Sequence, residues 1–182
     1  MPQEMTKLHV GEQAPAFTLP NIAGQSQQLQ MLLAAGPLLL VFLRGTWCPT
    51  CRAYLKMLER NYASYQAAGV QLVAIAHQRV EIVGGYFRLE PISYPYLLDS
   101  DLKVITNYGL VDSVPAEEVA YSRSPRTAYP AVLLLDPKGT IRWLYVGSEV
   151  SDRPDSDEIA EQIALAGFDP PAAAPKVDHA AG

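Results

Sequence analysis

The chain contains two cysteines, Cys48 and Cys51, which lie three positions apart in the segment VFLRGTWCPTCR at residues 41–52. Such a pair can supply half of a metal site, attach haem, form a structural cross-link or act as a redox couple. Haem attachment needs a histidine directly after the second cysteine, where this chain has Arg52. A structural zinc site usually needs four Cys or His ligands, and the histidines are scattered along the chain. A cross-link between such near neighbours removes little entropy from the unfolded chain, so the sequence favours a redox couple.

The elements predicted around the pair favour a reactive thiolate. An apolar strand is predicted to end near Arg44, and a helix to begin near Pro49, where a proline costs no hydrogen bond. Both sulfurs would then lie at the N-terminus of a helix, where the helix dipole and free N–H groups lower the pKa of a thiol. Arg44 and Arg52 add positive charge nearby. Because a second thiol within one turn can resolve a mixed disulfide, we predict a redox site without a metal or cofactor.

Length, composition and charge indicate one soluble domain. The chain has 182 residues, of which 49% are hydrophobic and 18% are charged, as in ordinary globular proteins. A net charge of −5 provides no basic field for phosphates, so we expect no nucleic-acid partner. The opening MPQEMTKLHV lacks the layout of a secretory signal, and the stretch GPLLLVFL is too short to cross a bilayer. We therefore expect a cytoplasmic protein without a membrane partner, in which two close cysteines are more often catalytic or metal-binding than a permanent bridge.

Apolar runs and helical spacing predict an α/β fold. Strands are predicted at residues 37–43, 70–76, 94–99, 131–136 and 140–147, the last two as a hairpin around DPKG. Helices are predicted at residues 49–69, 80–89, 100–109 and 155–167. Parallel strands joined by helices must be buried on both faces, and the closing hairpin adds antiparallel strands. The sequence therefore predicts an α/β sandwich with a mixed central sheet.

Three further segments are predicted to be irregular. Residues 11–30 are turn-rich and are expected to form an extended lead-in with short strands, and residues 111–128 are expected to be a loop insertion. Residues 169–182 are rich in Pro and Ala and are expected to be a disordered tail. This division leaves a single domain at residues 1–168.

The cysteine segment resembles a known family. RGTWCPTC is similar to the R-G-x-W-C-P-x-C signature of peroxiredoxin-like proteins of the alkyl hydroperoxide reductase/thiol-specific antioxidant (AhpC/TSA) group, within the thioredoxin-fold superfamily. VGEQAPAFTLPNIAGQ resembles the opening of the group, GPLLLVFLRG its first core strand, GVQLVAIAHQ its second, and YPAVLLLDPKGTIRWLYVG the segment near its end. The resemblance covers about residues 10–147. It implies a thioredoxin-like (peroxiredoxin-like) sandwich with flanking helices.

The same resemblance implies residues that support the cysteines. Thioredoxin-like folds place a cis-proline beside the Cys-x-x-Cys turn, and Pro130 lies at that position. A cis bond would leave the backbone of Tyr129 free to pair with an extended substrate. Trp47 is expected to shield the sulfurs and to form part of a docking surface. Pro49 and Thr50, which separate the cysteines, are expected to tune the redox potential.

Three functions are compatible with these residues. In the first, Cys48 attacks a disulfide in a partner protein or a small thiol compound, Cys51 releases the product, and thioredoxin or glutathione is the external reductant. In the second, the chain is an antioxidant peroxidase in which Cys51 reduces a peroxide and Cys48 condenses with the resulting sulfenic acid. In the third, the chain is a non-catalytic binding module on a redoxin scaffold, because a fold does not guarantee a function.

The resemblance to true peroxiredoxins is incomplete at the site, and this favours the first function. That family has a Thr or Ser three positions before its peroxidatic cysteine. Aligning Cys51 with that cysteine puts Cys48 in the hydroxyl position and Arg44 in the place of a proline. Pro130 falls where the family has a distant arginine, and Arg126 and Arg44 are the candidates to replace that arginine.

Other polar residues near these segments are expected to be structural. Thr46 is expected to cap the helix that follows it. Arg153, with Asp152 and Asp155, is expected to be the solvated start of the last helix. His77 follows the second strand and is left out of the predicted site.

Overall fold

The computed structural model describes residues 7–169, so the predicted tail lies outside the described residues except for Asp169. The centre of the fold is a five-stranded sheet in the order β5-β4-β3-β8-β9. Its strands are β3 (Leu38–Leu43), β4 (Gln71–Ala76), β5 (Tyr96–Leu98), β8 (Ala131–Leu135) and β9 (Ile141–Val146). Strand β3 pairs in parallel with β4 and antiparallel with β8, which confirms the predicted mixed sheet.

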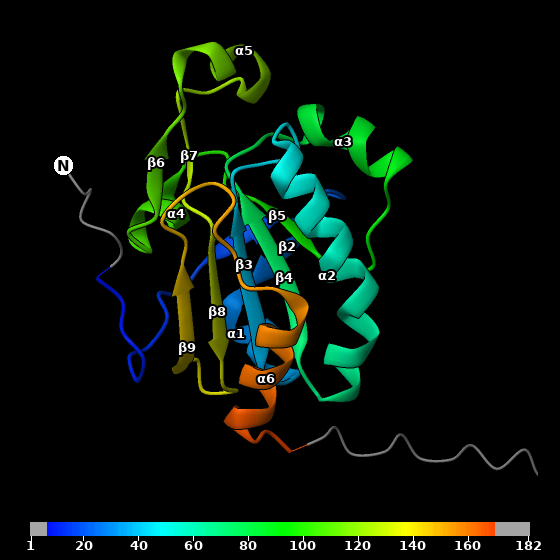
Figure 1. Ribbon diagram of the computed structural model, residues 1–182, viewed down its shortest axis with the longest axis vertical. Coiled ribbons are helices and arrows are strands. Elements are labelled where there is room, and N and C mark those ends of the chain that lie inside the picture. The colour runs from blue at the N-terminus through cyan, green and yellow to red at the C-terminus, as the bar shows by residue number, and fades with distance from the viewer. Residues whose placement is uncertain (1–6, 170–182) are drawn as a thin grey trace, which may run out of the picture.

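Helices cover both faces of this sheet, which is why β3 is apolar along its whole length. One layer consists of α2 (Pro49–Ala67), α3 (Val80–Leu89) and α6 (Ser156–Ala166), and the opposite layer contains α1 (Leu29–Ala34) and α4 (Lys103–Asn107) (Figure 1). Successive residues of a strand point to opposite faces. Leu39 and Val41 accordingly pack against the first layer, and Leu40 and Phe42 pack against the second.

Two short segments differ from the predictions. Helix α1 was not expected, and it forms because Leu29 and Leu33, four positions apart, are both buried against the sheet. Residues 111–128 were expected to be a loop, but they contain the antiparallel strands β6 (Val111–Ser113) and β7 (Arg126–Ala128). A 3-10 turn, η1 (Ala116–Glu118), and a short helix, α5 (Val119–Ser122), connect them. The expected lead-in does carry short strands, β1 (Thr18–Pro20) and β2 (Ser26–Gln28).

The cysteines lie at one end of the sheet. Parallel strands β3 and β4 both finish at this end, the upper end in Figure 1, where α2 begins and α5 stands above the sheet. The loop that joins β9 to α6 also reaches this end of the molecule. Along the part of the chain that the structure describes, none of the helices is both long and apolar enough to span a bilayer.

The packing of β3 gives a test of the fold. Replacing Leu40 by Ala should lower the free energy of unfolding by about 2–5 kcal/mol, because Leu40 is fully buried and its loss leaves a cavity. Leu165 on α6 is 72% exposed, so Leu165→Ala is the matched control and should leave the stability nearly unchanged. Urea unfolding followed by circular dichroism measures both values. Equal unfolding midpoints for the two variants would contradict the placement of β3 in the core.

Candidate active site

Both cysteines are buried at the N-terminus of α2. Cys48 is the N-cap residue and has an extended backbone, Pro49 is the first helical residue, and Cys51 lies in the first turn. Both thiols are free, and only 2% of Cys48 and 0% of Cys51 is exposed. The predicted position of the sulfurs at a helix N-terminus is therefore confirmed. The backbone N–H of Cys51 points at the sulfur of Cys48, as expected for an anion held by the open end of a helix.

A tight loop between β3 and α2 fixes the position of Cys48. Gly45 has a φ of +140°, and a Cβ there would lie 2.6 Å from Nε1 of Trp47, so only glycine fits this backbone. The indole Nε1–H of Trp47 donates to the carbonyl oxygen of Arg44 at 3.1 Å. The N–H of Cys48 donates to the carbonyl oxygen of Gly45 at 3.2 Å. The sequence RGTWC is thus a folded turn that presents Cys48 to the helix.

Gln78, which sequence reasoning did not identify, holds this loop against β4 and β5. Its Oε1 accepts hydrogen bonds from the N–H of Thr46 at 3.0 Å and from the hydroxyl of Tyr96 at 2.6 Å. Its Nε2 donates to the hydroxyl oxygen of Thr46 at 3.0 Å. The expected helix-capping role of Thr46 is therefore wrong, because the hydroxyl is engaged by Gln78 and the N-cap is Cys48.

Arg44 brings positive charge to Cys48, as expected. Its side chain is 4% exposed, and its Nη1 lies 3.9 Å from the sulfur of Cys48. The guanidinium group also donates to Glu118 of η1 at 2.8 Å and stacks on the ring of Trp47, 4.6 Å from its centroid. These contacts keep the charge in place beside the sulfur.

Arg153 contacts the sulfur of Cys51. The prediction that Arg153 is solvated at the start of the last helix is therefore wrong. Its Nη2 donates to the sulfur of Cys51 at 3.0 Å across 102 positions of sequence. Its Nε donates to the carbonyl oxygen of Val150 at 3.1 Å, and its guanidinium group lies 5.1 Å from the ring centroid of Tyr54. Asp155, by contrast, does begin the last helix, because its carboxylate accepts from backbone N–H groups of the first turn.

The surroundings of the two thiols shift their pKa values in opposite directions. A hydrogen bond donated by Cys51 lowers the pKa of Cys48 to about 5, and the nearby Arg44 and Arg153 act in the same direction. Burial raises the pKa of Cys51 well above its ordinary value, and the adjacent Cys48 sulfur raises it further. The pair therefore holds one proton near neutral pH, with Cys48 as the thiolate and Cys51 as the thiol. A thiolate is the nucleophilic form of cysteine.

The other predicted supporting residues are distributed unevenly around the sulfurs. Trp47 is partly exposed and packs against the core that contains both cysteines, and Pro49 and Thr50 reach the surface between them. Arg52 points away, because its Nε donates to the carbonyl oxygen of Thr46 and its guanidinium group lies over the ring of Tyr86. Within residues 7–169, the cationic side chains that donate to the sulfurs are those of Arg44 and Arg153.

Arg126 does not reach the site. It is exposed on β7, and the hydrogen bond that fixes it runs from its backbone N–H to the hydroxyl oxygen of Ser124. The resemblance made Arg126 a candidate for the distant arginine of peroxiredoxins. That part of the prediction is not supported by the geometry.

Pro130 lies near the site but is not a cis-proline, so that prediction is wrong. Residues 7–169 contain no cis peptide bond, and the trans form of an X–Pro bond is the more stable by about 0.5–1 kcal/mol. The N–H of Tyr129 is also not free, because it donates to the carbonyl oxygen of Leu110 at 2.7 Å. The carbonyl oxygen of Pro130 accepts from Gly147 at 2.9 Å. Pro130 instead lies close to Tyr54 and Arg153.

The described residues contain no group of three or more His, Cys, Asp or Glu side chains that could hold a metal ion.

Comparison with known proteins places this site in a family. Residues 10–144 match the AhpC/TSA family. The chain belongs to the AhpC/TSA family. Among curated proteins, the chain is similar to the thiol-disulfide oxidoreductase ResA of Halalkalibacterium halodurans, which is 34% identical over 103 residues, covering 55% of this chain and 56% of that relative. ResA of Geobacillus thermodenitrificans is 24% identical over 148 residues, covering 80% of this chain and 74% of that relative.

Solved structures confirm the fold class predicted for this AhpC/TSA protein. Peroxidoxin BcpB from Mycobacterium tuberculosis superposes with a TM-score of 0.71 at 17% identity, over 88% of this chain and 96% of that one. Reduced Prx3 from Vibrio vulnificus gives a TM-score of 0.74 at 16% identity, over 86% of this chain and 99% of that one. The fold is therefore thioredoxin-like, with the arrangement found in peroxiredoxins. The first-matched ResA relatives are longer than the matched region, which spans 56–60% of their length.

The asymmetry of the two thiols predicts the pH dependence of alkylation. The rate at which iodoacetamide modifies Cys48 should be half-maximal near pH 5. It should fall at lower pH, because the sulfur gains a proton as the pH drops through its pKa. Above neutral pH the rate should be level, whereas the rate of a free cysteine still rises through about pH 8.5. Mass spectrometry of peptides after timed quenching assigns the modified residue.

Two variants provide the control for this profile. Cys51→Ala removes the hydrogen bond to Cys48 and should raise the pH at which alkylation is half-maximal, and Cys51→Ser, which keeps an O–H donor, should raise it less. A Cys48 profile that climbs through pH 8–9 in the unmodified chain, as in a free thiol, would contradict the assignment of the thiolate.

Proposed function

We propose that the protein is a thiol–disulfide oxidoreductase in which Cys48 and Cys51 cycle between a dithiol and a disulfide. The observation that carries this proposal is the placement of two free thiols at the N-terminus of α2, with Cys48 as the N-cap residue and Cys51 in the first turn. The hydrogen bond from Cys51, which lowers the pKa of Cys48, supports it. The name of the matched relatives, thiol-disulfide oxidoreductase, supports the same activity.

The reaction proceeds in two exchange steps. The Cys48 thiolate attacks one sulfur of a substrate disulfide, R–S–S–R′, and R′–S⁻ leaves, so that a mixed disulfide joins Cys48 to R–S. Cys51 then gives up its proton and attacks the Cys48 sulfur, and the second product leaves as R–S⁻, which takes up a proton. The substrate is reduced by two electrons, and the protein becomes the Cys48–Cys51 disulfide. A dithiol or thiol reductant, such as thioredoxin or glutathione, restores the dithiol.

The surroundings of the cysteines suit a disulfide carried on a protein or a small thiol compound. Cys48 lies next to the partly exposed ring of Trp47, and Pro49 is exposed beside it, so part of the approach is apolar. Trp47 would contact the bound substrate in this proposal. Pro49 and Thr50 determine how the first turn of α2 presents its N–H groups, which is how residues between two cysteines affect redox potential.

Reduction of insulin by dithiothreitol, followed by turbidity, tests the proposal. The wild-type protein should accelerate the reaction over dithiothreitol alone, and Cys48→Ser should abolish the acceleration because the nucleophile is lost. Cys51→Ser should also slow turnover, with a mixed disulfide on Cys48 that accumulates and can be seen by intact mass. A wild-type rate equal to that of dithiothreitol alone would overturn the oxidoreductase proposal and favour a binding module.

Peroxide reduction is the second candidate function, and the contact of Arg153 with Cys51 favours it. Peroxiredoxins place an arginine beside the peroxidatic cysteine, and Arg153 puts one 3.0 Å from Cys51. The raised pKa of Cys51 opposes this function, because a peroxidatic cysteine must be a thiolate.

Peroxide consumption by the two serine variants separates these functions. If Cys51 is peroxidatic, hydrogen peroxide should oxidise Cys48→Ser to a sulfenic acid that dimedone traps, and Cys51→Ser should be inert. The thiolate assignment made above predicts the reverse pattern, with slow oxidation at Cys48 of Cys51→Ser. Rapid trapping of Cys51 would therefore replace the first function by the second.

A further inference from the structure

We propose that Arg153 is a catalytic residue of the exchange reaction: its guanidinium group stabilises negative charge on the Cys51 sulfur during the second step. Cys51 must carry that charge when it attacks the mixed disulfide on Cys48, and again when it leaves as the Cys48–Cys51 disulfide is reopened. This inference rests on the proposed function and assigns a residue to its resolving step.

The guanidinium group is held in place before any charge forms. Nη2 lies 3.0 Å from the Cys51 sulfur, Nε is fixed by the carbonyl oxygen of Val150, and the plane stacks on Tyr54. The hydroxyl of Tyr54 donates to the carbonyl oxygen of Pro154 at 2.9 Å, which ties the arginine's neighbour to α2. Fixed donors stabilise a developing charge better than mobile ones, because they need no reorganisation when the reaction occurs.

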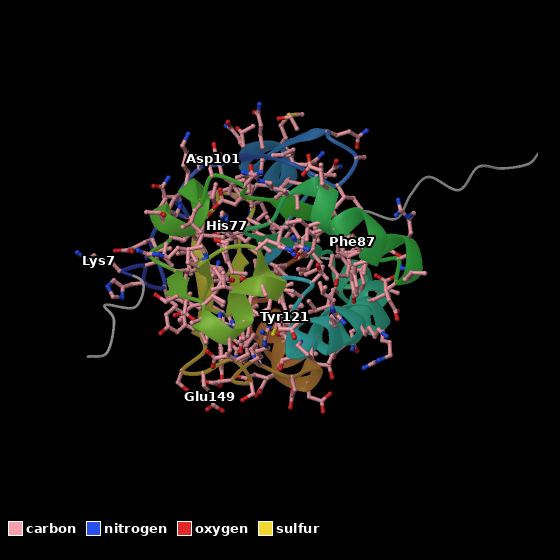
Figure 2. The ribbon with its side chains drawn as sticks, turned by 90° about the horizontal axis from the view of Figure 1, so that it is seen from above. Lys7, His77, Phe87, Asp101, Tyr121 and Glu149 are labelled. Atoms are coloured by element: carbon pink, nitrogen blue, oxygen red, sulfur yellow. The ribbon has the colours of Figure 1, made fainter. Side chains whose placement is uncertain are left out.

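The loop that carries Arg153 is itself tightly built. The carboxylate of Asp152 accepts from the N–H of Ser148 at 2.6 Å, from the Ser148 hydroxyl at 2.7 Å and from the Tyr145 hydroxyl. A Cβ on Gly147 would lie 2.3 Å from the carbonyl oxygen of Asp152, so the chain passes too close to itself for any other residue. Glu149 marks this loop in Figure 2, which looks down on the end of the molecule that carries α5 and Tyr121.

Arg153 also has unused hydrogen-bonding capacity beside the sulfur. Its Nη1 is buried and has no hydrogen-bond partner among the described residues. The two neighbouring carboxylates are engaged elsewhere, since Asp152 binds Ser148 and Tyr145 and Asp155 caps α6. The contact of the Arg153 guanidinium group with Cys51 is therefore not shared with either of these carboxylates.

Arg153 is the cation that donates a hydrogen bond to Cys51 among the described residues. Within residues 7–169, the titratable groups that act on or respond to this sulfur are Cys48 of α2, Tyr86 of α3, Tyr96 of β5 and Arg153. Burial raises the pKa of both tyrosines, so they are neutral when exchange takes place. Arg153 is thus the group whose charge can favour the Cys51 thiolate.

Arg153 does not occupy the position of the arginine in the peroxiredoxin pattern. That arginine aligns with Pro130, whereas Arg153 comes from the loop between β9 and α6, 23 positions later. The proton balance of the step is complete without another reactant: Cys48–S–S–R and Cys51–SH give the Cys48–Cys51 disulfide and R–SH. The proton of Cys51 ends on the departing thiol, and Arg153 keeps its own protons throughout.

Single-turnover reaction of the reduced protein with 5,5′-dithiobis(2-nitrobenzoate) tests the proposal. The first thionitrobenzoate is released when Cys48 attacks, and the second when Cys51 resolves the mixed disulfide. In Arg153→Gln the first phase should change little above pH 7, because Cys48 stays a thiolate there even when the loss of Arg153 raises its pKa from about 5. The second phase should slow at least about tenfold, because the donor that stabilises the developing Cys51 thiolate is lost. The pH profile of the second phase should move to higher pH, because Arg153 lowers the pKa of Cys51. Arg153→Lys, which keeps a charge, should recover part of the rate.

Arg142→Gln is the matched control, because Arg142 is an exposed arginine on β9 that pairs with Asp136. It should show both phases at wild-type rates. The proposal is overturned if Arg153→Gln leaves the second phase and its pH profile unchanged, or if both phases slow equally with a lower thermal midpoint and Arg153→Lys rescues neither. Failure of the proposed function looks different, since the wild-type protein itself would then release no second thionitrobenzoate and would not accelerate insulin reduction.

Discussion

Two sulfurs are buried within one helical turn, and the site depends on which of them carries a negative charge and on the groups that compensate this charge. Burial opposes a thiolate on either residue, and two adjacent thiolates would repel each other. The protein resolves this by placing Cys48 at the open end of α2 beside Arg44 and leaving Cys51 deeper, as a proton donor to Cys48. Arg153 approaches the deeper sulfur from a loop far along the chain. Cys48 is therefore the first nucleophile, and Cys51 becomes the second when it loses its proton.

The fold supplies the positions that this arrangement needs. Strand β3 is buried on both faces and ends just before Gly45 turns the chain, so the turn that carries Cys48 starts from the core of the sheet. Gln78 ties the same turn to the neighbouring strands through Thr46 and Tyr96. In the loop after β9, the backbone of Asp152 packs closely against Gly147, and the next residue, Arg153, contacts Cys51 of α2. Rigid elements thus hold both sulfurs and both cations, as pre-organised catalysis requires.

Much of the fold was predictable because its signals are local. Long apolar runs identified β3 and β4, helical spacing identified α2, and the turn DPKG identified the final hairpin. Three-residue strands such as β6 and β7 carry too few side chains to show a period, so residues 111–128, which contain both strands, were predicted to be a loop. At the site, spacing revealed Cys48 and Cys51, and Arg44 was noted because it is adjacent. Gln78 and Arg153 act across 32 and 102 positions, and no local pattern marks such contacts.

The central claim is that the two sulfurs form a reversible couple tuned by unequal charge, and their reduction potential tests it most directly. Protein equilibrated in a series of dithiothreitol or glutathione redox buffers, quenched with acid and measured by intact mass, should show one two-electron transition. Stabilisation of the Cys48 thiolate favours the reduced form, so the midpoint should lie above about −300 mV, the upper limit typical of structural disulfides. A midpoint below that value, or no conversion between dithiol and disulfide in any buffer, would contradict the account.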